Sequence, residues 1–209
     1  MDGLLIDSEP LWGEAADETF KPYGFHLTPA QYATTTGMRT KEFVEAWFYQ
    51  YKIDNRFLDI AIKEILDSVV HKVATKGKPM QGIEHIFNFF ISRNFKIGLA
   101  TSSGTPLIDV VVDKLGIRSH LHAIESAADL PFGKPHPQVY LNCAAKLNSH
   151  PTECICFEDS FNGMIAAKAA RMKCVVVPSA EDHRNVKFNA ADLKLSSLQN
   201  FNELLMHSL

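Results

Sequence analysis

Short apolar runs alternate with helical segments in the second half of the chain, and this alternation constrains the fold more than any other feature of the sequence. The runs lack the in/out alternation of half-exposed strands, so we expect strands that are buried on both faces. Such strands form a parallel sheet that helices cover on both sides, and the sequence therefore predicts a doubly wound α/β fold. The runs are Ile97 to Ala100, Ala123 to Glu125, Ile155 to Phe157 and Val175 to Val177.

The segment 11–78 has a different pattern, with apolar residues at helical spacing and no convincing strand. One helix start is especially clear at Thr28, Pro29 and Gln31. The Thr side chain can cap the helix, Pro suits its first position, and Gln can reach back to the capping residue. Apolar residues also form a continuous stripe around Trp47, so we interpret this tryptophan as part of the packing between helices.

These two patterns divide the chain. We predict a helical cap at residues 11–78, inserted into an α/β core that is built from residues 1–10 and 79–209. The connections, at Pro10-Leu11 and at Lys76 to Pro79, are short and suit a hinge between a cap and a core. With 209 residues, of which 46% are hydrophobic, the chain is long enough for both parts to bury apolar side chains.

Charge and composition disfavour several classes of partner. The net charge is −3 and no run of like charges occurs, so the sequence offers no basic surface for nucleic acid or for an anionic membrane. No apolar stretch approaches the roughly 20 residues of a membrane span, and the acidic start lacks the basic region of a signal peptide. We therefore expect a cytoplasmic protein. The four cysteines lack CxxC spacing, which disfavours a zinc site or a disulfide.

Polar side chains follow the apolar runs at the positions where a doubly wound sheet binds its ligands, beyond the carboxyl ends of the strands. Thr101 and Ser102 follow the first run, Lys134 lies in the connection after the second, and Glu158 and Asp159 end the third. Hydroxyl and amide groups donate to phosphoryl oxygens, a lysine adds compact positive charge, and carboxylates suit Mg²⁺. The set indicates a site for a phosphate ester.

Each of these features also has an ordinary interpretation. Thr101 to Gly104 resembles a common turn from a strand into a helix, and Glu158-Asp159 can be a helix cap followed by a first-turn acid. Lysines before prolines are usually solvated, and Asp2-Gly3 is a common turn sequence. The order of the features and their shared place at strand ends favour the functional interpretation.

The same residues resemble the motifs of the haloacid dehalogenase superfamily of phosphatases and phosphomutases. A helical insert after the first motif is similar to the branch of β-phosphoglucomutase-like enzymes, which includes small sugar-phosphate phosphatases. The stretches from Glu125 to Leu141 and from Glu158 to Pro178 look especially like hexitol and 2-deoxyglucose 6-phosphate phosphatases. The motifs are Asp2-Gly3 with Asp7-Ser8-Glu9, then Leu99 to Ser103, then Gly133 to Pro137, then Phe157 to Ser160.

The resemblance implies roles for most of these residues. Asp2 is implied to be the catalytic acid and base and to ligate Mg²⁺ through its backbone carbonyl, with Glu158 and Asp159 as the remaining metal ligands. Thr101 and Lys134 are implied to assist catalysis by holding the phosphoryl group.

Ser102 and Ser103 are implied to complete the phosphate site. Arg39, in the cap loop Gly37 to Thr40, is implied to contact the sugar or its phosphate, and the alternative is an ordinary surface arginine.

The chain departs from the family at the first motif, Asp-x-Asp-Gly, because Met1 occupies the position of x. The resemblance therefore places the nucleophilic Asp, and the apolar first strand that leads into it, before Met1, and we expect extension of the sequence to reveal them. A late start, unseen preceding residues and a degenerate relative are the alternatives, and we favour the first two. The 209-residue chain itself is expected to be inactive and to expose two edges where a central strand is missing.

The expected activity is that of a Mg²⁺-dependent phosphatase that acts on a phosphorylated hexose, deoxyhexose or hexitol through an aspartyl-phosphate. One alternative is a β-phosphoglucomutase-like phosphomutase, and another is a relative that binds phosphate without turnover. The expected partner is a small phosphorylated sugar, and the expected state is a monomer.

Overall fold

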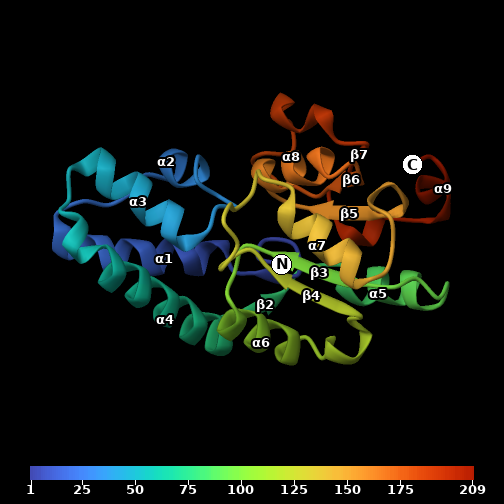
Figure 1. Ribbon diagram of the computed structural model, residues 1–209, viewed down its shortest axis with the longest axis horizontal. Helices are drawn as coiled ribbons and strands as arrows, with labels where there is room; N and C mark the ends of the chain where they lie inside the picture. Colours follow the sequence, from blue (N-terminus) through green and yellow to red (C-terminus); the bar gives the residue numbers. More distant parts are fainter.

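The computed structural model describes residues 1–209 and shows two lobes side by side (Figure 1). One lobe consists of helices alone, and the other contains the parallel strands with helices on both faces. The helices of the first lobe are α1 (Glu9–Phe20), α2 (Pro29–Ala33), α3 (Thr40–Tyr51) and α4 (Leu58–Lys76).

Aromatic side chains form the centre of the helical lobe. Phe20 is fully buried and stacks on Phe25 and Phe43, with ring centroids 4.6 and 5.7 Å apart. The capping box expected at the start of α2 is present, because the Thr28 hydroxyl accepts from the backbone N–H of Gln31. Trp47 is 4% exposed and packs among the helices, as expected from its apolar stripe.

The second lobe confirms the doubly wound α/β fold. Strands β3 and β4 are parallel, and so are β5, β6 and β7, which form a separate sheet. Each predicted strand is present within two residues of its expected bounds. Buried residues alternate with half-buried ones in β4 and β5, whereas β6 is buried on both faces after Lys173. The strands are β3 (Gly98–Thr101), β4 (Ala123–Ser126), β5 (Ile155–Glu158), β6 (Lys173–Val176) and β7 (Leu193–Lys194).

Helices connect these strands in the order expected for βαβ units. Pro106 lies in the first turn of α6, where its missing N–H and fixed φ suit a helix start. The helices are α5 (Ile83–Ile91), α6 (Thr105–Lys114), α7 (Gln138–Lys146), α8 (Phe161–Ala169) and α9 (Glu203–His207). Short 3-10 helices lie in the connections at Lys21–Tyr23, Asn55–Phe57, Arg118–His120, Pro151–Glu153, Val186–Ala190 and Leu198–Asn200.

The two connections between the lobes lie against each other. Strand β1 (Ile6–Asp7) pairs antiparallel with β2 (Lys78–Pro79), and Ile6 is opposite Pro79. Pro10 and Leu11 belong to the first turn of α1, so the first connection is earlier in the chain than the expected hinge at these residues. The chain therefore crosses between the lobes as a two-stranded ribbon.

A gap separates the two parallel sheets. No backbone hydrogen bond joins β3 to β5, and a cavity of about 400 Å³ lies between them, lined mainly by apolar side chains that include Leu5, Leu99 and Phe157. No segment within residues 1–209 supplies a strand here.

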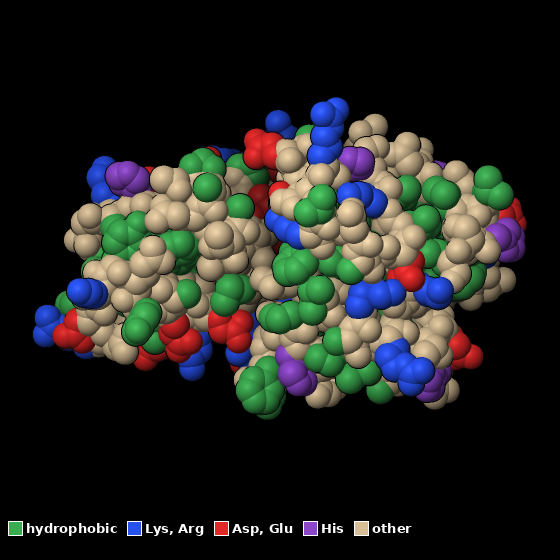
Figure 2. Space-filling view, turned by 90° about the horizontal axis from the view of Figure 1, so that it is seen from above, with side chains coloured by type: hydrophobic (Ala, Val, Ile, Leu, Met, Phe, Trp, Pro, Cys, Tyr) green, Lys and Arg blue, Asp and Glu red, His purple; other side chains and the backbone are tan.

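The surface carries mixed charge. On the face shown in Figure 2, basic and acidic side chains are interspersed over both lobes, without a continuous basic patch. None of the helices combines the length and the apolar composition that a membrane crossing requires.

Candidate active site

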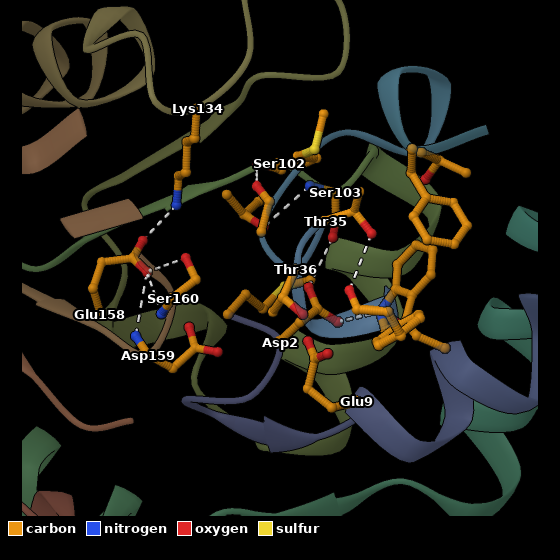
Figure 3. A pocket seen from close by; sticks show the side chains of 18 residues that line it. Asp2, Glu9, Thr35, Thr36, Ser102, Ser103, Lys134, Glu158, Asp159 and Ser160 are labelled. Carbon is orange, nitrogen blue, oxygen red and sulfur yellow. Dashed lines mark hydrogen bonds and ion pairs between the residues drawn. The ribbon is translucent and has the colours of Figure 1, made fainter. Parts of the chain in front are cut away.

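A pocket lies between the carboxyl ends of the core strands and the cap loop that precedes α3 (Figure 3). All the site residues expected from the sequence line this pocket except Arg39. The expected residues in its lining are Asp2, Thr101, Ser102, Ser103, Lys134, Glu158 and Asp159.

Neutral donors hold the carboxylate of Asp2. The Ser8 hydroxyl and the Trp12 indole N–H donate to Oδ1 at 2.8 and 3.1 Å, and the Ser103 hydroxyl donates to Oδ2 at 2.7 Å. These bonds fix the side chain without pairing it to a positive charge. Ser103 was expected to bind phosphate, and in the structure its hydroxyl orients Asp2 instead. Trp12 was missed by the sequence analysis, although it lies on the same helix as Glu9 of the first motif.

A buried ion pair joins two of the strand ends. Lys134 Nζ lies 2.6 Å from Glu158 Oε1, and each side chain is 5% exposed. The Tyr140 hydroxyl donates to the same oxygen. Burial acts to raise the pKa of Glu158, but the Lys134 charge, the charge of the chain's amino terminus and the hydrogen bonds from Lys134 and Tyr140 together lower that pKa to about 2. Both groups are therefore charged at neutral pH, and Glu158 fixes the position of the lysine.

The second oxygen of Glu158 is also engaged. Oε2 accepts from the backbone N–H groups of Asp159 and Ser160 at 3.2 and 3.3 Å, and from the Ser160 hydroxyl at 3.1 Å. Both oxygens of Glu158 therefore accept from protein donors, and its expected role as a Mg²⁺ ligand stays a prediction. No group of three or more His, Cys, Asp or Glu side chains is arranged to hold a metal ion.

Asp159 differs from Glu158 in lacking a cationic partner. Its Oδ2 lies 2.2 Å from the position that a Cβ would take at Gly3, so the close approach requires glycine there, at φ +66°. Burial raises the pKa of Asp159 to about 7, and the Glu158 charge adds to the increase. A carboxylate held close to the Asp2 backbone without a counter-charge fits a hard divalent cation, which takes oxygen ligands.

Glu9, in the first turn of α1, adds a further acid to the pocket. Burial raises its pKa to about 8, and the charges of Asp159 and Asp2 raise it further. No hydrogen bond or ion pair within the protein engages its carboxyl group. Figure 3 shows Glu9 below Asp2, on the same side as Asp159. The sequence analysis quoted Glu9 within the first motif but assigned it no role.

The end of β3 forms the other wall. Thr101 is buried, and its hydroxyl accepts from the backbone N–H of Ser103 at 3.2 Å. The Ser102 hydroxyl donates at 2.9 Å to the carbonyl of Gly37 in the cap loop. Lys134 reaches the same wall, with Nζ 3.5 Å from the Ala100 carbonyl. The amides and hydroxyls at the start of α6 and the lysine are thus close together, an arrangement that suits a phosphoryl group.

Arg39 does not face the pocket, contrary to its expected contact with the sugar or its phosphate. Its guanidinium donates to the carbonyls of Leu130 and Ala127 at 2.5 and 3.4 Å and lies 2.5 Å from Glu42. The two carbonyls come from the loop after β4, so Arg39 links the cap to the core, whereas Glu42 lies in α3 of the cap itself. The cap contributes uncharged side chains to the pocket instead: Tyr32, Thr35, Thr36, Met38, Thr40 and Phe43.

Comparison with known proteins agrees with this arrangement. A model of the haloacid dehalogenase-like hydrolase family matches residues 1–177. The chain belongs to this family. The hydrolase is 36% identical to hexitol phosphatase B of Escherichia coli K12 over 199 residues, which cover 95% of this chain and 90% of the relative. It is 28% identical to a phosphorylated carbohydrates phosphatase of Thermotoga maritima over 87% of this chain and 85% of the relative.

Solved structures confirm the fold of the hydrolase. A β-phosphoglucomutase from Clostridium difficile superposes with a TM-score of 0.84 at 24% identity, covering 99% of this chain and 92% of that one. A second superposition, with a TM-score of 0.86 at 23% identity, is with a protein from Bacteroides vulgatus described as a β-phosphoglucomutase, and it covers 100% of this chain and 87% of that one. The fold implied by the resemblance to the β-phosphoglucomutase-like branch is therefore confirmed.

Proposed function

We propose that this hydrolase is a Mg²⁺-dependent phosphatase of phosphorylated hexoses, deoxyhexoses or hexitols. The observation that carries the proposal is the arrangement around Asp2. Thr101, Ser102 and Lys134 form a wall suited to phosphoryl oxygens, and the carboxylate of Asp159 lies on the opposite side without a counter-charge. The activities named for hexitol phosphatase B and for the carbohydrate phosphatase of Thermotoga maritima support the choice of substrate.

In the proposed reaction, an Asp at the position before Met1 attacks phosphorus and forms an aspartyl-phosphate. Asp2 gives its proton to the departing sugar oxygen, so the alcohol leaves uncharged. Asp2 then takes a proton from water, the water attacks the aspartyl-phosphate, and inorganic phosphate and the free Asp result. Ser8, Trp12 and Ser103 keep Asp2 oriented through both steps.

Lys134, Thr101 and Ser102 are proposed to hold the phosphoryl oxygens, and Glu158 holds the lysine in place. The Asp159 carboxylate and the Asp2 backbone carbonyl would hold Mg²⁺, which when bound neutralises charge on the phosphoryl group. We also propose that residues 11–78 act as the cap over a core of residues 1–10 and 79–209, and that the protein works as a monomer.

Three versions of the protein test the proposal. The first is the 209-residue chain, the second carries a short apolar segment and Asp before Met1, and the third carries the same segment with Asn. We expect hydrolysis of hexitol 6-phosphate only by the second, dependent on Mg²⁺ and abolished by EDTA. Replacing Asp2 by Asn in that version should lower kcat by about 100- to 10,000-fold. Equal activity of the Asp and Asn versions would disprove the aspartyl-phosphate route.

A further inference from the structure

The cap side of the pocket carries no positive charge. Lys134 is the one lysine or arginine among the lining residues, and it lies on the core side, paired with Glu158. The cap arginine closest in sequence to the pocket loop, Arg39, is held by carbonyl oxygens and by Glu42. A ligand group that enters under the cap therefore meets no cation.

Hydroxyl groups without protein partners face this part of the pocket. The Tyr32 hydroxyl and the Thr36 hydroxyl line it, and neither makes a hydrogen bond to another residue, whereas Thr35 donates to the Tyr32 carbonyl and accepts from Trp47. A hydroxyl can donate one hydrogen bond and accept two, which matches the alcohol groups of a sugar or a polyol.

Acidic groups occupy the remaining side. Glu9, Asp2 and Asp159 lie together at the base of the pocket (Figure 3). A second anion placed among them would lose its hydration without gaining a cationic partner. The acids and the unpartnered hydroxyls thus favour a ligand that is neutral beyond its phosphate.

We propose that this pocket selects its substrate by charge: it accepts one phosphoryl group, bound at Lys134, and a neutral polyhydroxy leaving group under the cap, and it rejects a second phosphate or a carboxylate. The inference rests on the proposed phosphatase function and makes Tyr32 and Thr36 determinants of specificity.

Charge selection separates a phosphatase from a phosphomutase. A mutase transfers the phosphoryl group from its Asp to a hydroxyl of a hexose monophosphate, which frees the Asp carboxylate and yields a hexose bisphosphate. That bisphosphate must turn over in the site, so its second phosphate has to be held under the cap. Because the cap side here offers Tyr32, Thr36 and Met38 and no cation, the bisphosphate has no place to bind.

Calorimetric titration of the protein in Mg²⁺ with hexitol 6-phosphate, hexose 1,6-bisphosphate and 2-phosphoglycolate tests the proposal. We expect the hexitol monophosphate to bind at least about tenfold more tightly than either of the others, because the extra anion is unpaired. Equal or tighter binding of the bisphosphate would overturn charge selection and leave the phosphatase function intact. Binding of none of the three would overturn the proposed function, and charge selection with it.

A matched pair of variants separates charge from size. Thr36→Arg places a guanidinium under the cap, and we expect it to raise the affinity for the bisphosphate relative to the monophosphate by about tenfold or more. Thr36→Gln adds similar bulk without charge and should leave that ratio unchanged. Thermal unfolding establishes that both variants fold. An equal change of the ratio in both variants would show that size, and not charge, controls selection.

Discussion

Asp159 differs from the other acids at the core strands because no cationic side chain pairs with its carboxylate. Glu158, its neighbour, is matched by Lys134 and Tyr140, whereas Asp159 faces Gly3 and the charge of Glu158. The pKa of Asp159 is therefore raised above that of an unfolded chain, from 3.8 to about 7. A group of this kind weakens the fold when it is ionised, and a bound cation removes the cost.

Asp159→Asn is expected to stabilise the metal-free protein. The folded pKa lies above the unfolded one, so the unfolded state loses its proton first, and stability falls as the pH rises from about 4 to 7. In EDTA at pH 7.5 the variant should be more stable by about 1 to 3 kcal/mol, and Mg²⁺ should no longer raise its Tm. Thermal unfolding with EDTA and with Mg²⁺ measures both effects.

Asp182→Asn, which removes a partner of Lys187, is the control and should give no gain in stability. A lower Tm for Asp159→Asn would contradict this account.

Replacing only one residue of the Lys134–Glu158 pair is expected to destabilise the fold strongly. Lys134→Met leaves the Glu158 carboxylate buried without its cation, which should lower the free energy of unfolding by about 3 to 5 kcal/mol. The double variant Lys134→Met/Glu158→Gln should recover part of this loss, because no buried charge remains. Urea denaturation gives the values. Lys63→Met, at an exposed pair with Asp67, is the control and should cost far less. Failure of the double variant to recover stability would show that the charge is not the cause.

At the scale of elements, local signals predicted the strands and helix starts well. The apolar runs end where β3 and β5 end, and the capping box at Thr28 forms as expected, because these signals depend on residues a few positions apart. The contacts of Arg39 with the core could not be predicted, because the two carbonyls that it reaches lie 88 and 91 residues away, in a loop whose position depends on how the cap sits on the core. The residues near Arg39 in the sequence do not predict such a long-range contact.

Arg39 and Glu42 of the cap pack directly on the loop that leads to Lys134. A Cβ at Gly133 would lie 2.7 Å from Glu42 Oε2 and 2.8 Å from Arg39 Nε, so the closed arrangement of cap and core depends on glycine there. Both side chains are largely enclosed, and the Gly133 amide donates to Glu42 at 3.4 Å. The contact couples the cap to the placement of the proposed phosphate-binding lysine.

Gly133→Ala is expected to separate the cap from this loop. The added methyl forces Arg39 and Glu42 to move, which should lower the free energy of unfolding by about 1 to 3 kcal/mol and speed hydrogen exchange in residues 127–133. Gly13→Ala is the matched control, since nothing lies within 4 Å of its Cβ position in α1. It should stabilise the helix by about 0.5 to 1 kcal/mol. Unchanged exchange in residues 127–133 of Gly133→Ala would show that the contact does not hold the loop.

For the whole molecule, the gap between the sheets is the dominant feature. Strands β3 and β5 each present an unpaired edge to a cavity of about 400 Å³ that is lined by apolar side chains, with Met1 and Leu4 at its border. Unpaired edges and empty apolar volume both weaken a fold. The site residues Thr101 and Glu158 stand at the ends of these two strands, so the gap also affects how firmly the two walls of the pocket are held together.

Filling the gap is therefore expected to stabilise the whole molecule. A version with five or six apolar residues of high strand propensity before Met1 can pair with both edges at once and bury its side chains in the cavity, which should raise the free energy of unfolding by several kcal/mol, at about 25 cal/mol per Å² of apolar surface buried. Urea denaturation and binding of a hydrophobic dye measure the gain in stability and the loss of exposed apolar surface.

A segment of the same length made of Ser and Asn is the control, because it can pair with the edges but cannot fill an apolar cavity. If both segments stabilise equally, edge pairing alone accounts for the gain; if neither does, the cavity does not receive a strand.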